Sequence, residues 1–270
     1  MRIRFAAGLL LFTLTAHAAE PMQLLIFSGG KTEADAKRAL ASYERLKAVL
    51  ARAVVLAPGQ PQIVESAKLP GLTAGFWVVT LGRCHAPADA LQAIKAVYPG
   101  TYAKPLTGDA GAEACPVLKG ETVSALDPTL RVGDRVVRGF ALEETSKDRQ
   151  GNESSSTQYE FVLTDKASGE VLAITETPGG GTTGAGSEGP TGAETQTCSA
   201  AVRLAKGSLV VSRTCTSQRT SCNYQEREIP TAWTETQRVT VAGDHLSVSR
   251  ADTIVTASST CSAENSSEGD

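Results

Sequence analysis

The sequence predicts an α+β protein. Its N-terminal part is expected to be a split β-α-β unit (ferredoxin-like, a four-stranded antiparallel sheet with two helices), followed by a disulfide-bonded antiparallel all-β domain. Three observations lead to this expectation. Extended and helical patterns alternate over residues 22–106 as strand, helix, strand, strand, helix, strand, which is the order of a split β-α-β unit. From residue 119 onward apolar and polar residues alternate without a helical period. All six cysteines follow the first eighteen residues, as in proteins that fold in an oxidising compartment.

The first eighteen residues have the organisation of a secretory signal peptide. Arg2 and Arg4 are basic, residues 6–14 are apolar, and Ala16-His17-Ala18 has the A-x-A form of a cleavage site. We therefore expect residues 1–18 to be removed and the mature protein to be periplasmic or secreted. No later segment has the roughly 18 uninterrupted apolar residues of a membrane helix, so no integral membrane segment is expected.

The charge balance argues against a polyanionic partner. The chain has 26 Lys and Arg against 29 Asp and Glu; without the two signal-peptide arginines the balance is 24 against 29, a net charge of −5. A mildly acidic chain gains little from electrostatic attraction to nucleic acid or anionic lipid. Neither is expected as a partner.

The first strand and helix of the α+β unit are marked by their end signals. Residues 23–27 are apolar and are followed by glycines. Thr32 is a good N-cap, and Asp35 stands at the N3 position of a short capping box. The helix is expected to fade near Ala51 to Arg52. Its apolar stripe, at three- and four-residue spacing, consists of Ala36, Leu40, Tyr43, Leu46 and Leu50.

The second half of the unit contains the stretch around which the domain is organised. Residues 62–66 are extended, and residues 75–82 form an apolar strand. Pro87 is placed to begin the next helix, which Tyr98-Pro99-Gly100 ends. A last short strand is expected at residues 101–104. The buried side of the second helix should carry Leu91, Ile94 and Val97 or Tyr98.

Three pieces of this half carry a family resemblance: Phe76-Trp77-Val78-Val79-Thr80-Leu81-Gly82, the Ala-rich helix 88–97, and Tyr102-Ala103-Lys104. Together they resemble the second half of a SPOR (sporulation-related repeat) domain, an exported bacterial module that binds the glycan strands of peptidoglycan. The resemblance covers residues 22–106 and implies glycan binding on the sheet face that the helices leave open. Since side chains alternate along a strand, Trp77 should face the helices, while Phe76 and Thr80 become the candidate ligand-binding residues.

The rest of the chain divides by composition. We expect an α+β domain at residues 20–107, a connector at 108–130 and an antiparallel β domain at 131–262. Residues 178–194 contain a Gly-rich run and are expected to form a flexible loop. Residues 263–270 are expected to be a disordered tail.

Hairpins in the β domain are predicted from turn residues. If Lys206-Gly207 is a two-residue turn, paired residue numbers sum to 413 and Cys198 lies opposite Cys215. This register gathers one face that is apolar except for Arg213, and a slip of one residue would scramble it. Gly243-Asp244 gives a second hairpin by the same test, and residues 165–169 are expected to connect a third. The face expected around the first hairpin consists of Cys198, Ala200, Val202, Leu204, Leu209, Val211, Arg213 and Cys215.

Six cysteines permit fifteen disulfide connectivities. The hairpin register favours Cys198–Cys215 at a non-hydrogen-bonded pair, where the α-carbons approach closely. For the remaining four we prefer Cys84–Cys115, which ties the end of the α+β unit to the segment that follows, and Cys222–Cys261, which fixes the end of the chain.

No group of residues has the pattern of a catalytic, metal or cofactor site. Residues 28–32 lie between a strand and a helix like a phosphate loop, but Leu25 stands where that motif needs its first glycine. Ser187 lies in a Gly-rich run and not at a nucleophile elbow. A disulfide explains Cys84 better than a thiol nucleophile beside His85 does, and Glu143-Glu144 alone do not define a glycosidase pair. Neither an enzyme nor a cofactor is expected.

The sequence is therefore interpreted as an exported, non-catalytic binding protein that contacts peptidoglycan glycan strands through its α+β domain. The alternative is an extracytoplasmic structural or protein-interaction protein without a glycan ligand.

Overall fold

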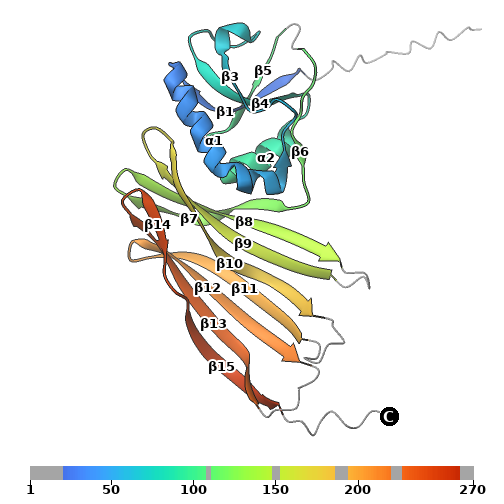
Figure 1. Cartoon of the computed structure of the whole chain (residues 1–270), viewed down its shortest axis with the longest axis vertical. Helices are drawn as coiled ribbons and strands as arrows, with labels where there is room; N and C mark the ends of the chain where they lie inside the picture. The colour runs from blue at the N-terminus through green and yellow to red at the C-terminus, as the bar shows by residue number, and fades with distance from the viewer. Residues whose placement is uncertain (1–20, 108–110, 148–152, 186–193, 220–226, 262–270) are drawn as a thin grey trace, which may run out of the picture.

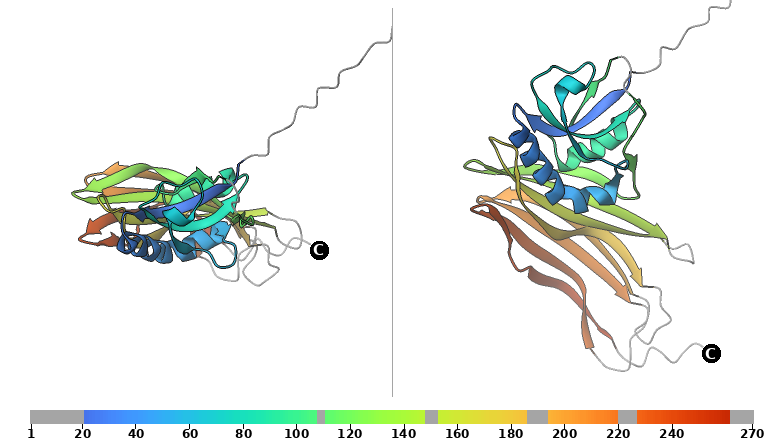
Figure 2. Two further views of the ribbon diagram at one scale, coloured as in Figure 1. Left: turned by 90° about the horizontal axis from the view of Figure 1, so that it is seen from above. Right: turned by 45° about the horizontal axis from the view of Figure 1, so that its top comes forward.

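The computed structural model describes residues 21–107, 111–147, 153–185, 194–219 and 227–261. In this part of the chain a four-stranded sheet, a layer with two α-helices and a nine-stranded sheet are stacked in that order (Figures 1 and 2). The predicted class, an α+β unit followed by an all-β region, is confirmed. None of the described helices combines the length and hydropathy needed to cross a membrane. Residues 1–18 and 263–270 lie outside the described ranges.

The small sheet contains β1 (Gln23–Gly30), β3 (Gln62–Glu65), β4 (Trp77–Cys84) and β5 (Tyr102–Pro105). Its order is β3-β4-β1-β5, and every neighbouring pair is antiparallel, as predicted for residues 22–106. A short 3-10 helix, η1 (Ser66–Lys68), lies between β3 and β4. Two further short strands, β2 (Val54–Val55) and β6 (Val117–Leu118), pair with each other.

Both predicted helices are present. Helix α1 (Glu33–Ala53) begins after Thr32, and the reciprocal bonds between Thr32 and Asp35 form the predicted capping box. Helix α2 (Ala88–Val97) follows Pro87 and ends before Tyr98. Four residues of the predicted stripe on α1 are buried and Leu40 is partly buried. Four residues outside the stripe are buried as well: Ala39, Ser42, Val49 and Ala53.

The large sheet has the order β14-β13-β12-β11-β10-β9-β8-β7, with β15 pairing with a second stretch of β13. Strand β7 occupies residues that were expected to be connector, so the sheet begins earlier than the predicted domain boundary at residue 131. The alternation of apolar and polar residues from residue 119 onward was the available signal for this strand. The strands are β7 (Thr122–Val132), β8 (Arg135–Lys147), β9 (Glu153–Asp165), β10 (Val171–Ala185), β11 (Glu194–Ala205), β12 (Ser208–Arg219), β13 (Arg227–Ala242), β14 (His245–Val248) and β15 (Asp252–Cys261).

The expected Gly-rich loop is a strand over residues 178–185, and its remaining residues 186–193 are outside the described ranges. The glycines serve close backbone approach. A Cβ on Gly179 would lie 2.6 Å from the Thr157 carbonyl oxygen, and a Cβ on Gly181 would lie 2.4 Å from that of Ser155. The ladder between β9 and β10 also shifts register between Pro178 and Gly181. Glycine therefore serves here to let the sheet bend. The Gly-rich composition had predicted a flexible loop instead.

The two parts share one hydrophobic core. The inner face of the small sheet and the helices pack together with four buried side chains of the large sheet, so the helices lie between two sheets and not at a free surface (Figure 2). The expected boundary near residue 107 is therefore a change of architecture and not a gap in packing. The four side chains are Phe140, Leu142, Val162 and Val171.

The opposite face of the large sheet closes on itself. Its second core joins residues of β7–β9, such as Leu130 and Phe161, to residues of β12 and β13, such as Leu209 and Val239. The strands of the two halves therefore face each other across this core, as the curved ribbon shows (Figure 1).

The hairpin predictions are confirmed. Cys198 pairs with Cys215 in the predicted register, with 4.1 Å between their α-carbons and a disulfide between them. The disulfide Cys84–Cys115 is also present. Cys261 ends β15, but Cys222 lies outside the described residues, and with it the third expected pairing. The Gly243-Asp244 hairpin and the β9–β10 connection at residues 165–170 are formed as expected.

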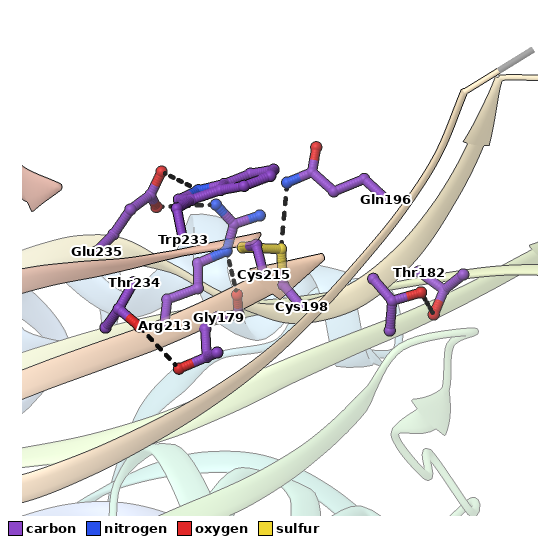
Figure 3. Close-up of a disulfide and its surroundings, with 11 residues drawn as sticks. Gly179, Thr182, Gln196, Cys198, Arg213, Cys215, Trp233, Thr234 and Glu235 are labelled. Carbon is purple, nitrogen blue, oxygen red and sulfur yellow. Dashed lines mark hydrogen bonds and ion pairs between the residues drawn. A yellow bond between two sulfur atoms is a disulfide. The ribbon is translucent and has the colours of Figure 1, made fainter. Parts of the chain in front are cut away.

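The exception on the hairpin face, Arg213, has partners. Its guanidinium pairs with Glu235 at 3.0 Å and donates a 2.9 Å hydrogen bond to the Gly179 carbonyl. The Trp233 indole N–H donates to the same carboxylate at 3.1 Å. Figure 3 shows this group beside the Cys198–Cys215 disulfide. The charge is thus satisfied within the sheet.

Candidate functional site

The predicted site is the face of the small sheet that points away from the helices. Along β4 the side chains alternate as expected: Val79 and Leu81 pack in the core with the helices, and Val78 packs on the other face with Leu24 and Ile26. We call this other face the outer face. Trp77 packs against the helix-side core, as predicted.

The outer face is not open at its centre. Leu69 and Leu106 are buried over it, packed against Leu24, Ile26 and Val78. The covering segment is held by two backbone bonds, from the Thr107 N–H to the Pro70 carbonyl (3.2 Å) and from the Leu106 N–H to the Met22 carbonyl (2.8 Å). This cover was not predicted, because its residues come from two segments far apart in the sequence: Leu69 lies between β3 and β4, and Leu106 follows β5.

Thr80 is consequently inaccessible. It is only 3% exposed, and its hydroxyl donates a 3.0 Å hydrogen bond to the Gln60 side-chain oxygen. Its position on the outer face was predicted correctly, but the expected contact with a ligand does not fit a residue under this cover. Thr80 instead holds the segment before β3 to the sheet.

Phe76 lies directly before β4 and is 40% exposed. Its backbone is fixed by Ser66: the Phe76 N–H donates to the Ser66 hydroxyl at 3.0 Å, and its carbonyl accepts from the Ser66 N–H at 2.8 Å. An exposed ring on a fixed backbone suits a stacking contact, because little conformational entropy is lost on binding.

Tyr102 on β5 is the second exposed aromatic residue of this unit, at 36%. It pairs with Ile26, which pairs with Thr80, which pairs with Gln62, so these four residues form one row across the sheet. Partial burial raises the pKa of the Tyr102 phenol, so its hydroxyl stays protonated. The sequence placed Tyr102 in a strand but did not select it as a ligand-binding residue; its alternation along the last strand was the available signal.

A polar cluster lies between the C-terminal end of α1 and the large sheet. Arg52 donates to Glu121 at 3.0 Å and to the Gln158 side-chain oxygen at 2.8 Å, and one of its nitrogens lies 3.8 Å from Glu160. Glu160 is 4% exposed. Burial and then the charge of Glu176 raise the pKa of Glu160 from 4.5 to about 7, against the opposing effect of Arg52. The sequence did not identify this cluster, because its members come from α1, the segment before β7 and two strands.

Two hollows flank the turn between β9 and β10. The turn is held to the α+β unit by a 3.0 Å hydrogen bond from the Tyr98 hydroxyl to the Gly169 carbonyl and by one from the Val171 N–H to the Ser42 hydroxyl. On one side is a hollow of about 290 Å³ that includes Asp35 and Arg38, which pair with each other. On the other side is a hollow of about 220 Å³.

The residues considered for catalysis do not form a reactive group. Cys84 is in a disulfide, and Glu143 and Glu144 are exposed on β8. Ser187 lies outside the described residues. Within the described ranges, no three His, Cys, Asp or Glu side chains are grouped so that they could hold a metal ion.

Comparisons with known proteins give no match: no family model, no curated protein and no solved structure matches this chain. The resemblance to SPOR domains stays a prediction.

Proposed function

We propose that the protein is an exported, non-catalytic binding protein whose α+β unit contacts the glycan strands of peptidoglycan. The observation that carries the proposal is the exposure of two aromatic side chains at the small sheet, Phe76 directly before β4 and Tyr102 on β5. Aromatic rings pack against the apolar C–H faces of sugars, and a phenol adds a hydrogen-bonding group.

The packing of the helices restricts where such a ligand can approach. The helix side of the small sheet is closed by the shared core with the large sheet. A long polymer is left with the outer face and its rim, where both aromatic residues are exposed. Thr80 has no place in this proposal, and Tyr102 replaces it.

Two observations support export. The two disulfides are typical of an oxidising compartment, and the N-terminal sequence has the features of a signal peptide. A periplasmic or secreted protein would meet peptidoglycan directly.

The test is co-sedimentation of the full mature chain, residues 19–270, with purified sacculi, both intact and stripped of stem peptides. We expect binding that increases on stripped glycan, and a retained fraction that falls several-fold in Phe76→Ala and in Tyr102→Ala. Leu204→Ala is the matched control, since Leu204 is exposed on β11 of the other sheet. Retention of both aromatic variants at the level of the unaltered protein would refute the proposal.

We also infer that the α+β unit is ferredoxin-like. The order β3-β4-β1-β5, the antiparallel pairing throughout and the placement of both helices on one face support this assignment.

A second candidate function, the binding of an extended protein segment, is favoured by the edge strand β15. Its only partner strand in the described sheet is β13, and it exposes Ile254 (66%) and Val255 (48%). Such an edge can accept another strand by main-chain hydrogen bonding. This function would be preferred if the chain failed to bind sacculi and an envelope protein cross-linked to β15 in the unaltered protein but not in Ile254→Lys.

A further inference from the structure

The hollow of about 220 Å³ lies where the C-terminal end of α2 meets the large sheet. Three of its lining residues, Val97, Val136 and Val162, are buried, whereas the cationic ones are half-buried or exposed. The valines therefore form the bottom of the hollow and the cations its mouth. The cationic lining residues are Arg131, Arg138 and Lys166.

The sheet register brings the two arginines together. Arg131 on β7 pairs with Val136 on β8, and Arg138 follows Val136 by two residues on the same face. Residues in this diagonal relation have α-carbons about 7–8 Å apart. Lys166 comes from the β9–β10 turn, and its N–H donates a 2.8 Å hydrogen bond to the Asp134 carbonyl in the turn between β7 and β8. Two turns and two strands thus place three cations around one opening.

These cations lack carboxylate partners in the described part of the chain. Asp165 also lines the hollow, but it is bonded to Arg135 and accepts from the backbone N–H groups of Ala167 and Ser168, which lower its pKa. Five other arginines in the described ranges do form ion pairs with carboxylates. Those five are Arg38, Arg45, Arg52, Arg135 and Arg213.

The end of α2 offsets only part of this charge. A helix C-terminus carries the equivalent of about −0.5 elementary charge, and one of its last carbonyls, that of Ile94, already accepts from the Tyr98 N–H. Asp165 offsets a further part, because its partner Arg135 is shared with Asp244. Three cations against one shared carboxylate and a helix end leave the mouth of this hollow net positive, above an apolar bottom.

We propose that this hollow binds a small oxyanion with an apolar body. The carboxylate or phosphate group is held by Arg131, Arg138 and Lys166, since guanidinium groups bind both kinds of oxyanion through paired hydrogen bonds. The apolar body lies on the three valines. The volume is below the roughly 300–1,000 Å³ of pockets for drug-sized ligands, so the ligand is small, of about the size of one substituted ring. This site is separate from the outer face of the small sheet and does not depend on glycan binding.

The experiment is a calorimetric titration of residues 19–270 with benzoate and with phenyl phosphate, paired with thermal melts. Benzamide, an uncharged analogue of benzoate, is the ligand control. We expect at least one anion to bind and to raise the melting temperature, less so at high salt because exposed charges are screened. The tighter of the two anions identifies the oxyanion group. Equal binding of benzamide, or no binding of either anion, would overturn the proposal.

Variants locate the binding. Arg138→Gln and Lys166→Gln should each weaken the bound anion at least tenfold while leaving the fold intact, because neither side chain has a carboxylate partner in the described structure. Arg203→Gln is the matched control: it removes one positive charge from an exposed position on β11 of the same sheet and should not change the affinity. If Arg138→Gln and Lys166→Gln both bind like the unaltered protein, the anion binds elsewhere and the assignment is wrong.

Discussion

Tyr159 on β9 donates a 3.0 Å hydrogen bond from its hydroxyl to the carbonyl of Ala200 on β11, although β10 lies between these strands in the sheet. The bond crosses β10 near its glycines: Gly180 lies beside the backbone of Ala200, and the ladder between β9 and β10 shifts register between Pro178 and Gly181. It ties together the two halves of the sheet that enclose the second core. The bend and the core therefore depend on the same few residues.

Tyr159→Phe should lower the free energy of unfolding by about 1 kcal/mol, the usual contribution of a buried hydrogen bond. Tyr102→Phe is the control, because the Tyr102 side chain is exposed and its hydroxyl has no partner among the described residues. Urea unfolding of both variants measures the difference. Equal losses in the two would mean that the bond to Ala200 contributes nothing.

Gly181→Ala should be more damaging, by about 2–4 kcal/mol. The residue has φ +141°, and its Cβ would lie 2.4 Å from the Ser155 carbonyl oxygen, a backbone atom that cannot move without disturbing β9. Gly120→Ala provides the comparison, since a Cβ there meets no atom within 4 Å. The measurement is the melting temperature of the two variants. An unchanged melting temperature in Gly181→Ala would show that glycine is not required at this position of the bend.

The features predicted from sequence are those that nearby residues determine. The capping box needs Thr32 and Asp35 three residues apart, and the Cys198–Cys215 register needs a two-residue turn and the alternation of side chains. The cover over Thr80 was missed because it depends on Leu69 and Leu106 folding back from separate segments.

The burial of the helices between two sheets was missed for a different reason. The second buried side of α1 consists largely of small residues such as Ala39 and Ser42, which give no hydrophobic period. Ser42 even accepts a hydrogen bond from the Val171 backbone, a contact between residues 129 positions apart. Likewise the glycines of β10 resemble a linker by composition, and only the crowding around them in the folded sheet reveals their role.

Glu160 should make stability depend on pH. Its pKa is about 7 in the folded protein, above the ordinary 4.5, so between these values the folded state binds more protons than the unfolded state. The free energy of unfolding therefore falls as pH rises from about 4.5 to 7, by at most about 3 kcal/mol from this group. Glu160→Gln removes the titrating group but keeps a polar side chain beside Gln158 and Arg52.

The measurement is urea unfolding at pH 5 and pH 8. We expect the loss of stability between these values to be smaller in Glu160→Gln than in the unaltered protein, and the variant to be the more stable at pH 8. Glu144→Gln, an exposed carboxylate on β8, should keep the original pH dependence. Identical slopes in all three proteins would show that Glu160 titrates normally.

Replacing both Cys198 and Cys215 by serine should destabilise the protein by about 3 kcal/mol, since the disulfide closes a loop with a sequence separation of 17. Selective reduction of Cys198–Cys215 in the unaltered protein, with Cys84–Cys115 kept intact, should lower the free energy of unfolding by the same amount. Mass spectrometry of unreduced peptides checks both pairings and also tests whether Cys222 is joined to Cys261. A double variant as stable as the unaltered protein would mean that the hairpin register alone holds the strands.

The α+β unit should not be stable when separated from the large sheet. Removing the chain after residue 107 exposes the helix surface that packs against Phe140, Leu142, Val162 and Val171, and it removes the bonds from Tyr98 to Gly169 and from Ser42 to Val171. At about 1.5 kcal/mol for each buried side chain, the four contacts are worth on the order of 6 kcal/mol, comparable to the whole stability of a typical domain. We expect residues 19–107 to melt far below the full chain or to aggregate, as circular dichroism and light scattering would record. A fragment that melts at the temperature of residues 19–270 would contradict the shared core. The expected instability also means that a failure of this fragment to bind sacculi would say nothing about glycan recognition, so binding has to be measured on the full mature chain.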